Sequence, residues 1–137
     1  MWIVYALLSA LFAALTSILA KAGLNGVDSN LATAIRTAIV LVMAWSIVFI
    51  TGKQNGVTDI TSKSWLFLVL SGLATGISWL FFYKALQMGE ASKVVPIDKL
   101  SVVIAMVMAV IILRENVGIK GLIGGLLITA GAILLAL

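Results

Sequence analysis

Cysteine and histidine are both absent from the sequence, and carboxylates are scarce. Without cysteine the chain has no disulfide framework, no thiolate nucleophile and no cysteine-based metal site. Without histidine it lacks the most common general base and the most common ligand of transition metals. The remaining carboxylates are Asp28, Asp59, Glu90, Asp98 and Glu115. We therefore expect no metal and no cofactor, and an enzyme is disfavoured because a paired acid and base are missing.

Charge of either sign is also rare. Charged residues make up 10% of the 137 residues and hydrophobic residues 63%, whereas soluble domains have roughly 25% charged and about 45–50% apolar residues. A soluble fold of this length leaves much of its surface in water, so the surplus apolar surface must contact lipid. The sequence predicts a multi-pass protein of the cell's inner (plasma) membrane, with the lipid bilayer as its surroundings.

The net charge of +4 does not indicate a nucleic-acid partner, because the basic residues form no run. In a membrane protein such residues lie at the headgroups and set orientation. On one side of the membrane, the second and fourth connections hold four basic residues. On the other side, the first and third connections hold two. Adding the basic residues inside the spans reverses the balance to four against five. The charges therefore permit insertion in both orientations.

Five apolar segments are each long enough to cross a membrane, which takes about 20 residues in a helix. We expect Ser29 or Asn30 to cap the second span and Pro96 to lie in the first turn of the fourth. Short connections favour antiparallel neighbours. The prediction is a single all-α domain over residues 1–137, a compact bundle of five transmembrane helices at about 2–20, 31–50, 65–86, 94–113 and 119–137.

The charges inside the spans all lie near one side of the membrane. They are Arg36, Lys84, Asp98 and Lys99. A charge at the bilayer centre costs roughly 2.5–3.5 kcal/mol even on the lenient insertion scale, so such groups pair or face water. The lysines have an alternative, since long side chains near helix ends can reach the headgroups. For Asp98, which is too short for that, we expect an ion pair with Arg36 or Lys84 that lines a polar vestibule.

Two aromatic residues lie four apart near the end of the third span. Trp79 and Tyr83 share one helical face and are candidates for the wall of a substrate pocket; aromatic residues near a helix end also serve as interface anchors. The substrate-binding candidates are therefore Arg36, Trp79, Tyr83, Lys84, Asp98 and Lys99. The basic groups would attract an anionic part of the substrate, and Asp98 would serve proton coupling.

Glycines recur four residues apart in two spans. Gly72 and Gly76 form one such pair, and Gly121 and Gly125 form another in the charge-free last span. Small residues let helix backbones approach closely in lipid. The last span is thus a candidate for dimerisation, with ordinary packing inside one bundle as the alternative.

The sequence resembles a single EamA-type repeat of the drug/metabolite transporter superfamily over nearly its whole length. The stretch from Phe82 to Pro96, FYKALQMGEASKVVP, is similar to the family's Tyr-x-Ala-Leu, small-residue turn and Val-x-Pro pattern. Leu113-Arg114-Glu115, followed by a glycine-rich last helix, resembles a second family pattern. Arg36 resembles the family's early second-helix arginine. The second proline that many members have in the fourth helix is missing, and Asp98 to Ser101 lie in that neighbourhood.

The resemblance implies one half of a ten-helix transporter built from two inverted-repeat-like halves, since most members carry two such repeats in one chain. A second copy, parallel or antiparallel, or a paralogue would then complete the pathway. The family moves amino acids, other metabolites, nucleotide sugars and drugs. The leading hypothesis is a transporter that works by alternating access. It would be a secondary transporter, without ATP chemistry, because no phosphate-binding loop of Walker type is present. The alternative is a non-transporting accessory or assembly subunit of a membrane complex.

Overall fold

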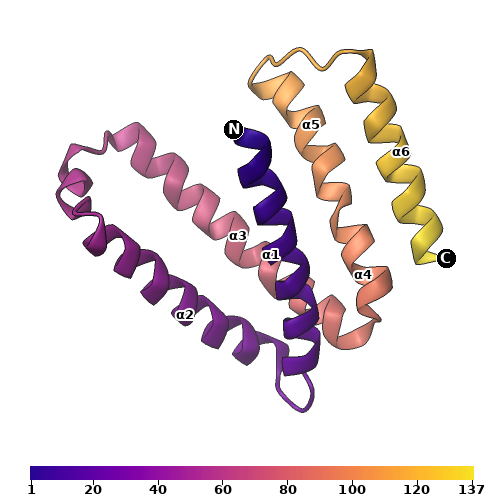
Figure 1. Cartoon of the computed structure of the whole chain (residues 1–137), viewed down its shortest axis with the longest axis horizontal. Helices are drawn as coiled ribbons and strands as arrows, with labels where there is room; N and C mark the ends of the chain where they lie inside the picture. Colours follow the sequence, from indigo (N-terminus) through magenta and orange to yellow (C-terminus); the bar gives the residue numbers. More distant parts are fainter. The chain divides into compact units, whose positions relative to one another are not determined.

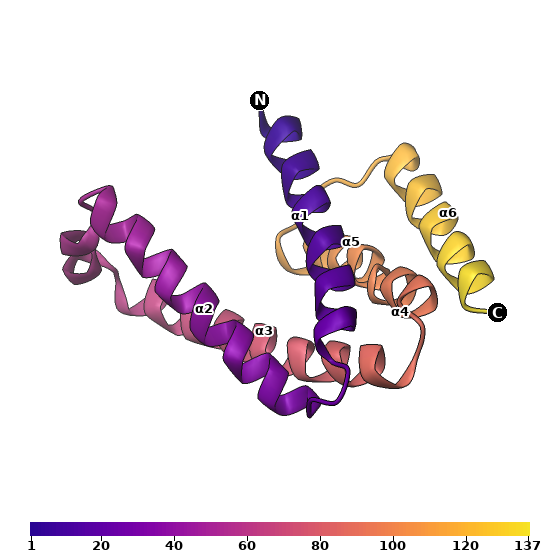
Figure 2. The ribbon, with the colours of Figure 1, turned by 60° about the horizontal axis from the view of Figure 1, so that its bottom comes forward.

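A computed structural model describes residues 1–137, and every regular element in it is a helix (Figure 1). The elements are α1 (Trp2–Gly23), α2 (Ser29–Ile50), the short 3₁₀ helix η1 (Gln54–Asp59), α3 (Ser62–Met88), α4 (Ala91–Asp98), α5 (Leu100–Ile112) and α6 (Ile119–Ala136). The order of the helices along the chain can be followed by colour in Figures 1 and 2.

The helices provide five segments that are long and apolar enough to cross a membrane. Four are single helices, and the fifth, Ala91–Ile112, combines α4 and α5. At most 11% of the most apolar window of any span is buried, so the apolar side chains face outward, as lipid contact requires. The predicted all-α membrane class with five spanning helices is confirmed.

The chain divides into two units. The first contains Met1–Lys21 and Met88–Leu137, and the second contains Ala22–Gln87. In the first unit α6 packs against both α4 and α5. In the second unit α3 runs back along α2 in the opposite direction after the turn at η1 (Figures 1 and 2).

The start of α2 differs from the prediction. Its N-cap is Asp28, whose carboxylate accepts hydrogen bonds from the backbone N–H groups of Asn30 (2.9 Å) and Leu31 (3.1 Å). Asp28 has extended backbone angles, whereas Ser29 is already helical. The prediction that Ser29 or Asn30 caps this helix was therefore wrong, because the carboxylate one residue earlier satisfies the exposed N–H groups.

The other end of α2 is closed by a glycine. Gly52 has a φ of +67°, which glycine adopts at little cost. Its N–H donates to the Phe49 carbonyl, and the Lys53 N–H donates to the Val48 carbonyl. This pair of bonds is the Schellman arrangement, which satisfies the last carbonyls of a helix.

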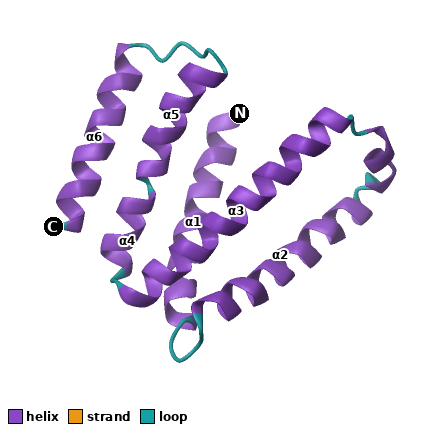
Figure 3. Ribbon diagram, turned by 180° about the vertical axis from the view of Figure 1, so that it is seen from behind, coloured by secondary structure: helices purple, strands orange, loops and turns teal.

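The fourth span is interrupted, as Figure 3 shows between α4 and α5. The helix begins at Ala91, so Pro96 lies beyond its first turn, and the predicted first-turn position was wrong. Proline has no N–H to donate to the carbonyl four residues earlier. Close behind it, the Lys99 N–H is shared between the carbonyls of Val95 (3.2 Å) and Pro96 (3.1 Å). The turn tightens there, and α5 begins at Leu100.

The glycines of α6 lie in two kinds of surroundings. A Cβ on Gly125 would lie 3.8 Å from both Val103 and Met106 of α5, and one on Gly121 would overlap the Val117 side chain. A Cβ on Gly124 or Gly131 would meet nothing within 4 Å. Gly121 and Gly125 therefore meet groups of their own chain, while Gly124 and Gly131 leave their side of α6 open. The role of the last span in dimerisation stays a prediction.

Candidate functional site

A cation stacked on two aromatic rings lies between α2 and α3, in the second unit. The guanidinium carbon of Arg36 lies 4.2 Å from the centroid of the Trp79 ring and 5.4 Å from that of the Tyr83 ring. Trp79 and Tyr83 are four residues apart on α3, so both rings lie on one helical face. We call these three residues the Arg36 cluster. Each contact is within the range of a cation–π interaction.

Tyr83 is the buried member of the cluster, whereas Arg36 and Trp79 are half-buried. Tyr83 is only 3% exposed, and its ring meets that of Phe82 edge to face, with centroids 6.1 Å apart. The Nη1 atom of Arg36 is buried and has no hydrogen-bond partner. Burying an unpaired donor of a charged group costs free energy. The site therefore has a donor, Nη1, that an acceptor would stabilise.

Local hydrogen bonds hold the surroundings of the cluster in place. The hydroxyls of Thr33 and Thr37 donate to the carbonyls of Ser29 (2.8 Å) and Thr33 (2.7 Å) within α2. At the end of α3, the amide of Gln87 donates to the Val27 carbonyl at 2.9 Å, which connects α3 to the loop before α2. These bonds hold the start of α2 and the end of α3 in place, and Arg36 contacts the two rings in this region.

Three further charged residues lie inside the predicted spans. Lys84 is exposed. Asp98 and Lys99 lie at the interruption between α4 and α5, where their side chains form an ion pair with 3.4 Å between Nζ and Oδ2. Their side chains are 33% and 51% exposed, respectively. The ion pair of Asp98 with Arg36 or Lys84 would connect the two units, and it stays a prediction, as do the roles of all six candidate residues in binding.

Lys21 has a structural role that sequence analysis missed. Its Nζ donates to the Gly89 carbonyl at 2.7 Å, directly after α3 ends at Met88. A cation is favourable at the carbonyl end of a helix. The two residues are 68 positions apart, so no local pattern signals the contact.

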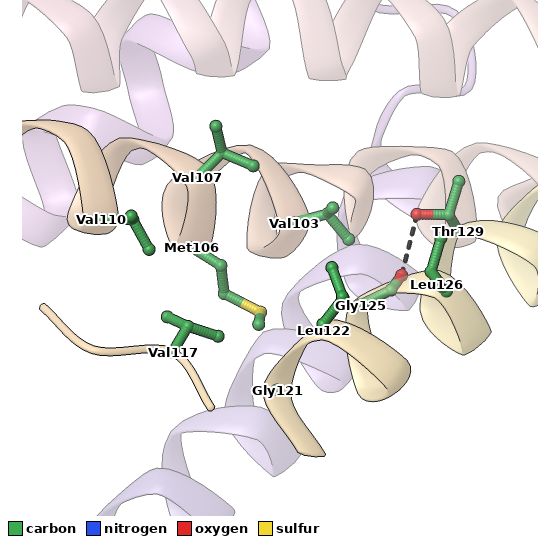
Figure 4. Close-up of a pocket in the computed structure, with 10 residues that line it drawn as sticks. All are labelled: Val103, Met106, Val107, Val110, Val117, Gly121, Leu122, Gly125, Leu126 and Thr129. Atoms are coloured by element: carbon green, nitrogen blue, oxygen red, sulfur yellow. Dashed lines mark hydrogen bonds between the residues drawn. The ribbon is translucent and has the colours of Figure 1, made fainter. Parts of the chain in front are cut away.

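A hollow lies between α5 and α6 in the first unit (Figure 4). Its volume is about 240 Å³, and its lining includes Met106, Val117, Gly121, Leu126 and Thr129. The one hydroxyl in this lining, that of Thr129, donates to the Gly125 carbonyl of its own helix at 2.9 Å. A site without an oriented polar group fixes no ligand position, so we assign this hollow to packing.

The chemistry open to the Arg36 cluster is binding. The structure holds no group of three or more His, Cys, Asp or Glu residues placed to bind a metal ion. The cluster offers N–H donors and aromatic faces, and neither group is a general base at neutral pH. Such a site can hold an anion or stabilise a charge.

Fold and site together define a multi-pass, all-helical membrane protein with a charged group held inside a spanning segment, which is the construction of membrane transport proteins. The chain belongs to the EamA-like transporter family, whose sequence model matches residues 1–137. This match confirms the family resemblance, and it points to a transporter rather than an enzyme.

Two relatives are similar to the chain. An uncharacterized transporter in the cobO 3′ region of Sinorhizobium sp. is 46% identical over 135 residues, which covers 98% of this chain and 96% of that protein. An uncharacterized protein of Methanocaldococcus jannaschii is 30% identical over 99 residues, covering 72% of this chain and 71% of that one. No solved structure matches the chain.

Proposed function

We propose that the chain is a secondary transporter of small metabolites or drugs in the inner (plasma) membrane, and that it works by alternating access without ATP. The observation that carries this proposal is the buried, unpaired Nη1 of Arg36 inside the spanning helix α2. An ionisable group within a span is costly, and it marks a substrate or ion pathway when it faces the bundle interior. Membership of a transporter family supports the same conclusion.

We propose further that two five-helix chains together form the working unit. A site enclosed on both sides of the membrane usually lies between two structural repeats, and this chain resembles one repeat. The Sinorhizobium relative is aligned over 96% of its length, so it too has one such repeat. The partner is a second copy, parallel or antiparallel, or a paralogue. The balanced distribution of basic residues supports the antiparallel arrangement.

Asp98 is proposed to couple transport to protons. It is the one carboxylate within the five spans, and it lies where the fourth span is interrupted. Interrupted helices in transporters expose backbone groups that bind substrates and coupling ions. Lys99, 3.4 Å away, would compensate the charge of Asp98 when its proton has left.

The proposal is tested by flux measurements in proteoliposomes with an imposed proton gradient and a panel of radiolabelled organic anions, amino acids and cationic drugs. We expect protein-dependent flux of at least one compound, with the gradient-driven part lost in Asp98→Asn and flux lowered about tenfold or more in Arg36→Gln. Lys63→Gln, which removes a charge from the first turn of α3, is the matched control and should retain flux. Absence of flux for the whole panel would favour the accessory-subunit alternative, whereas flux that neither variant changes would support transport and overturn the roles proposed for Arg36 and Asp98.

A further inference from the structure

The geometry of the Arg36 cluster points to a ligand class, and we infer that the cluster binds the carboxylate of a small organic monoanion. This inference rests on the proposed transport function, because the bound anion would be the transported substrate. It names the charged group that is recognised and the net charge of the molecule that carries it.

The stacking of Arg36 selects the direction from which a ligand can be bound. A guanidinium is planar, and its five N–H donors lie in that plane. The guanidinium carbon lies over the Trp79 ring, at 4.2 Å from its centroid, so the ring covers one side of the group and a ligand must reach N–H donors that point away from the ring. A carboxylate is planar too, and two parallel N–H···O bonds match it to the guanidinium edge.

The unpaired Nη1 atom supplies the second observation. It is buried and lacks an acceptor, although buried polar groups in proteins are nearly always hydrogen-bonded. A carboxylate oxygen at the guanidinium edge would be the missing acceptor.

The two helices that hold the cluster offer no anion of their own. The spans of α2 and α3 contain no Asp or Glu. Asp28, the nearest carboxylate along α2, lies about 12 Å before Arg36 at 1.5 Å per residue, and it is engaged as the helix cap. Asp59 lies in η1, past the far end of α2. The anion must therefore come from outside these helices.

The same composition sets the net charge of the ligand. One guanidinium balances one negative charge, and no carboxylate on α2 or α3 is available for an ammonium group. A zwitterion or a cation would leave its positive charge uncompensated among apolar side chains, which is strongly unfavourable in a membrane. A monocarboxylate on an apolar body fits both requirements.

Trp79 provides a direct signal for binding. In the full chain with Trp2, Trp45 and Trp65 changed to Phe, Trp79 is the single tryptophan, and it contacts the guanidinium. In detergent micelles, we would titrate this protein with cyclohexanecarboxylate, its isosteric amide, cyclohexylammonium, inorganic phosphate and the zwitterion 1-aminocyclohexanecarboxylate. We expect a saturable change in Trp79 emission with cyclohexanecarboxylate. Every other probe should bind with an affinity at least about tenfold lower.

Variants in the same single-tryptophan background assign the effect to Arg36. Arg36→Gln should abolish the saturable change, and Arg36→Lys should weaken binding several-fold because it keeps the charge but loses the planar fork. The matched control is Lys63→Gln, which removes a positive charge about 24 Å from Trp79 along α3 and should bind as the parent does. Helix content by circular dichroism establishes folding of each variant, and discrimination between the acid and its amide by the parent protein requires no variant.

The outcomes separate this inference from the transport proposal. Equal response to acid and amide, tighter binding of the zwitterion or the cation, or unchanged affinity in Arg36→Lys would overturn the inference, while flux of other compounds would leave transport standing. Arg36-dependent binding of the carboxylate without any flux in proteoliposomes would establish the site and overturn transport. Binding that persists in Arg36→Gln and is lost only in Asp98→Asn would place the site away from Arg36 and also overturn the inference.

Discussion

At the scale of single residues, the structure shows which polar groups of this apolar chain have hydrogen-bond or ion-pair partners. Asp28 caps a helix, Lys21 donates to the Gly89 carbonyl, and Asp98 pairs with its neighbour Lys99. Arg36 differs, because its guanidinium makes cation–π contacts while its Nη1 atom has no hydrogen-bond partner. This contrast is the reason to assign binding to Arg36 and structural roles to Asp28 and Lys21.

Asp28→Ala should destabilise the protein by about 1 kcal/mol, the typical contribution of an N-cap side chain. The carboxylate accepts from two backbone N–H groups of α2, and alanine leaves both without a side-chain acceptor. The measurement is unfolding by SDS titration in mixed micelles. Asp28→Asn, which keeps a side-chain oxygen, should unfold close to the parent; equal losses for alanine and asparagine would contradict the capping role.

At the scale of helices, the fourth span and the last span carry most of the new information. The fourth is two helices, α4 and α5, separated after Pro96, and its charged pair lies at the separation. In the last span, two glycines contact α5 or the loop before α6, and the others meet nothing. One glycine-rich sequence therefore serves two different faces of the same helix.

Gly121→Leu should destabilise the packing at the start of α6, by about 1–3 kcal/mol for an overpacked position. A Cβ at residue 121 would overlap the Val117 side chain, so leucine there must displace the loop before α6. Gly124→Leu is the matched control, because a Cβ there meets nothing within 4 Å. Thermal unfolding in detergent compares the two, and a larger loss for Gly124→Leu would show that the packing faces of α6 are assigned wrongly.

At the scale of the whole molecule, the proposed function depends on a second copy or a paralogue. The family match over residues 1–137 and the outward-facing apolar spans establish a multi-pass membrane protein of the transporter class. The basic residues favour neither orientation clearly. An antiparallel pair would use both orientations of one chain.

The absence of native cysteine makes the orientation directly measurable. Asn25→Cys and Asn55→Cys each place one thiol on an exposed residue, in connections that are expected on opposite sides of the membrane. With an impermeant maleimide added outside intact cells, dual insertion predicts labelling of about half of the molecules at each position. Complete labelling at one position and none at the other would exclude the antiparallel homodimer and leave the parallel one or a heterodimer.

The sequence by itself determined the membrane class, the helical fold and the family. Runs of about 20 apolar residues have one stable form in lipid, since a helix satisfies its own backbone groups, and the number of spans follows from counting them. The candidates Arg36, Trp79 and Tyr83 were also visible, because a charge within a span and two aromatic residues on one face are local patterns.

Only the tertiary structure decided which of these groups meet. Arg36 contacts residues more than 40 positions away, and such contacts depend on how α2 and α3 pack, which no periodicity encodes. The same holds for Lys21 with Gly89 and for the two faces of α6. The helix boundary at Ser29 depended on which nearby side chain caps the chain, and several polar residues there are similar candidates. In lipid, apolar patterns fix where helices form, while polar contacts and close packing fix which faces meet.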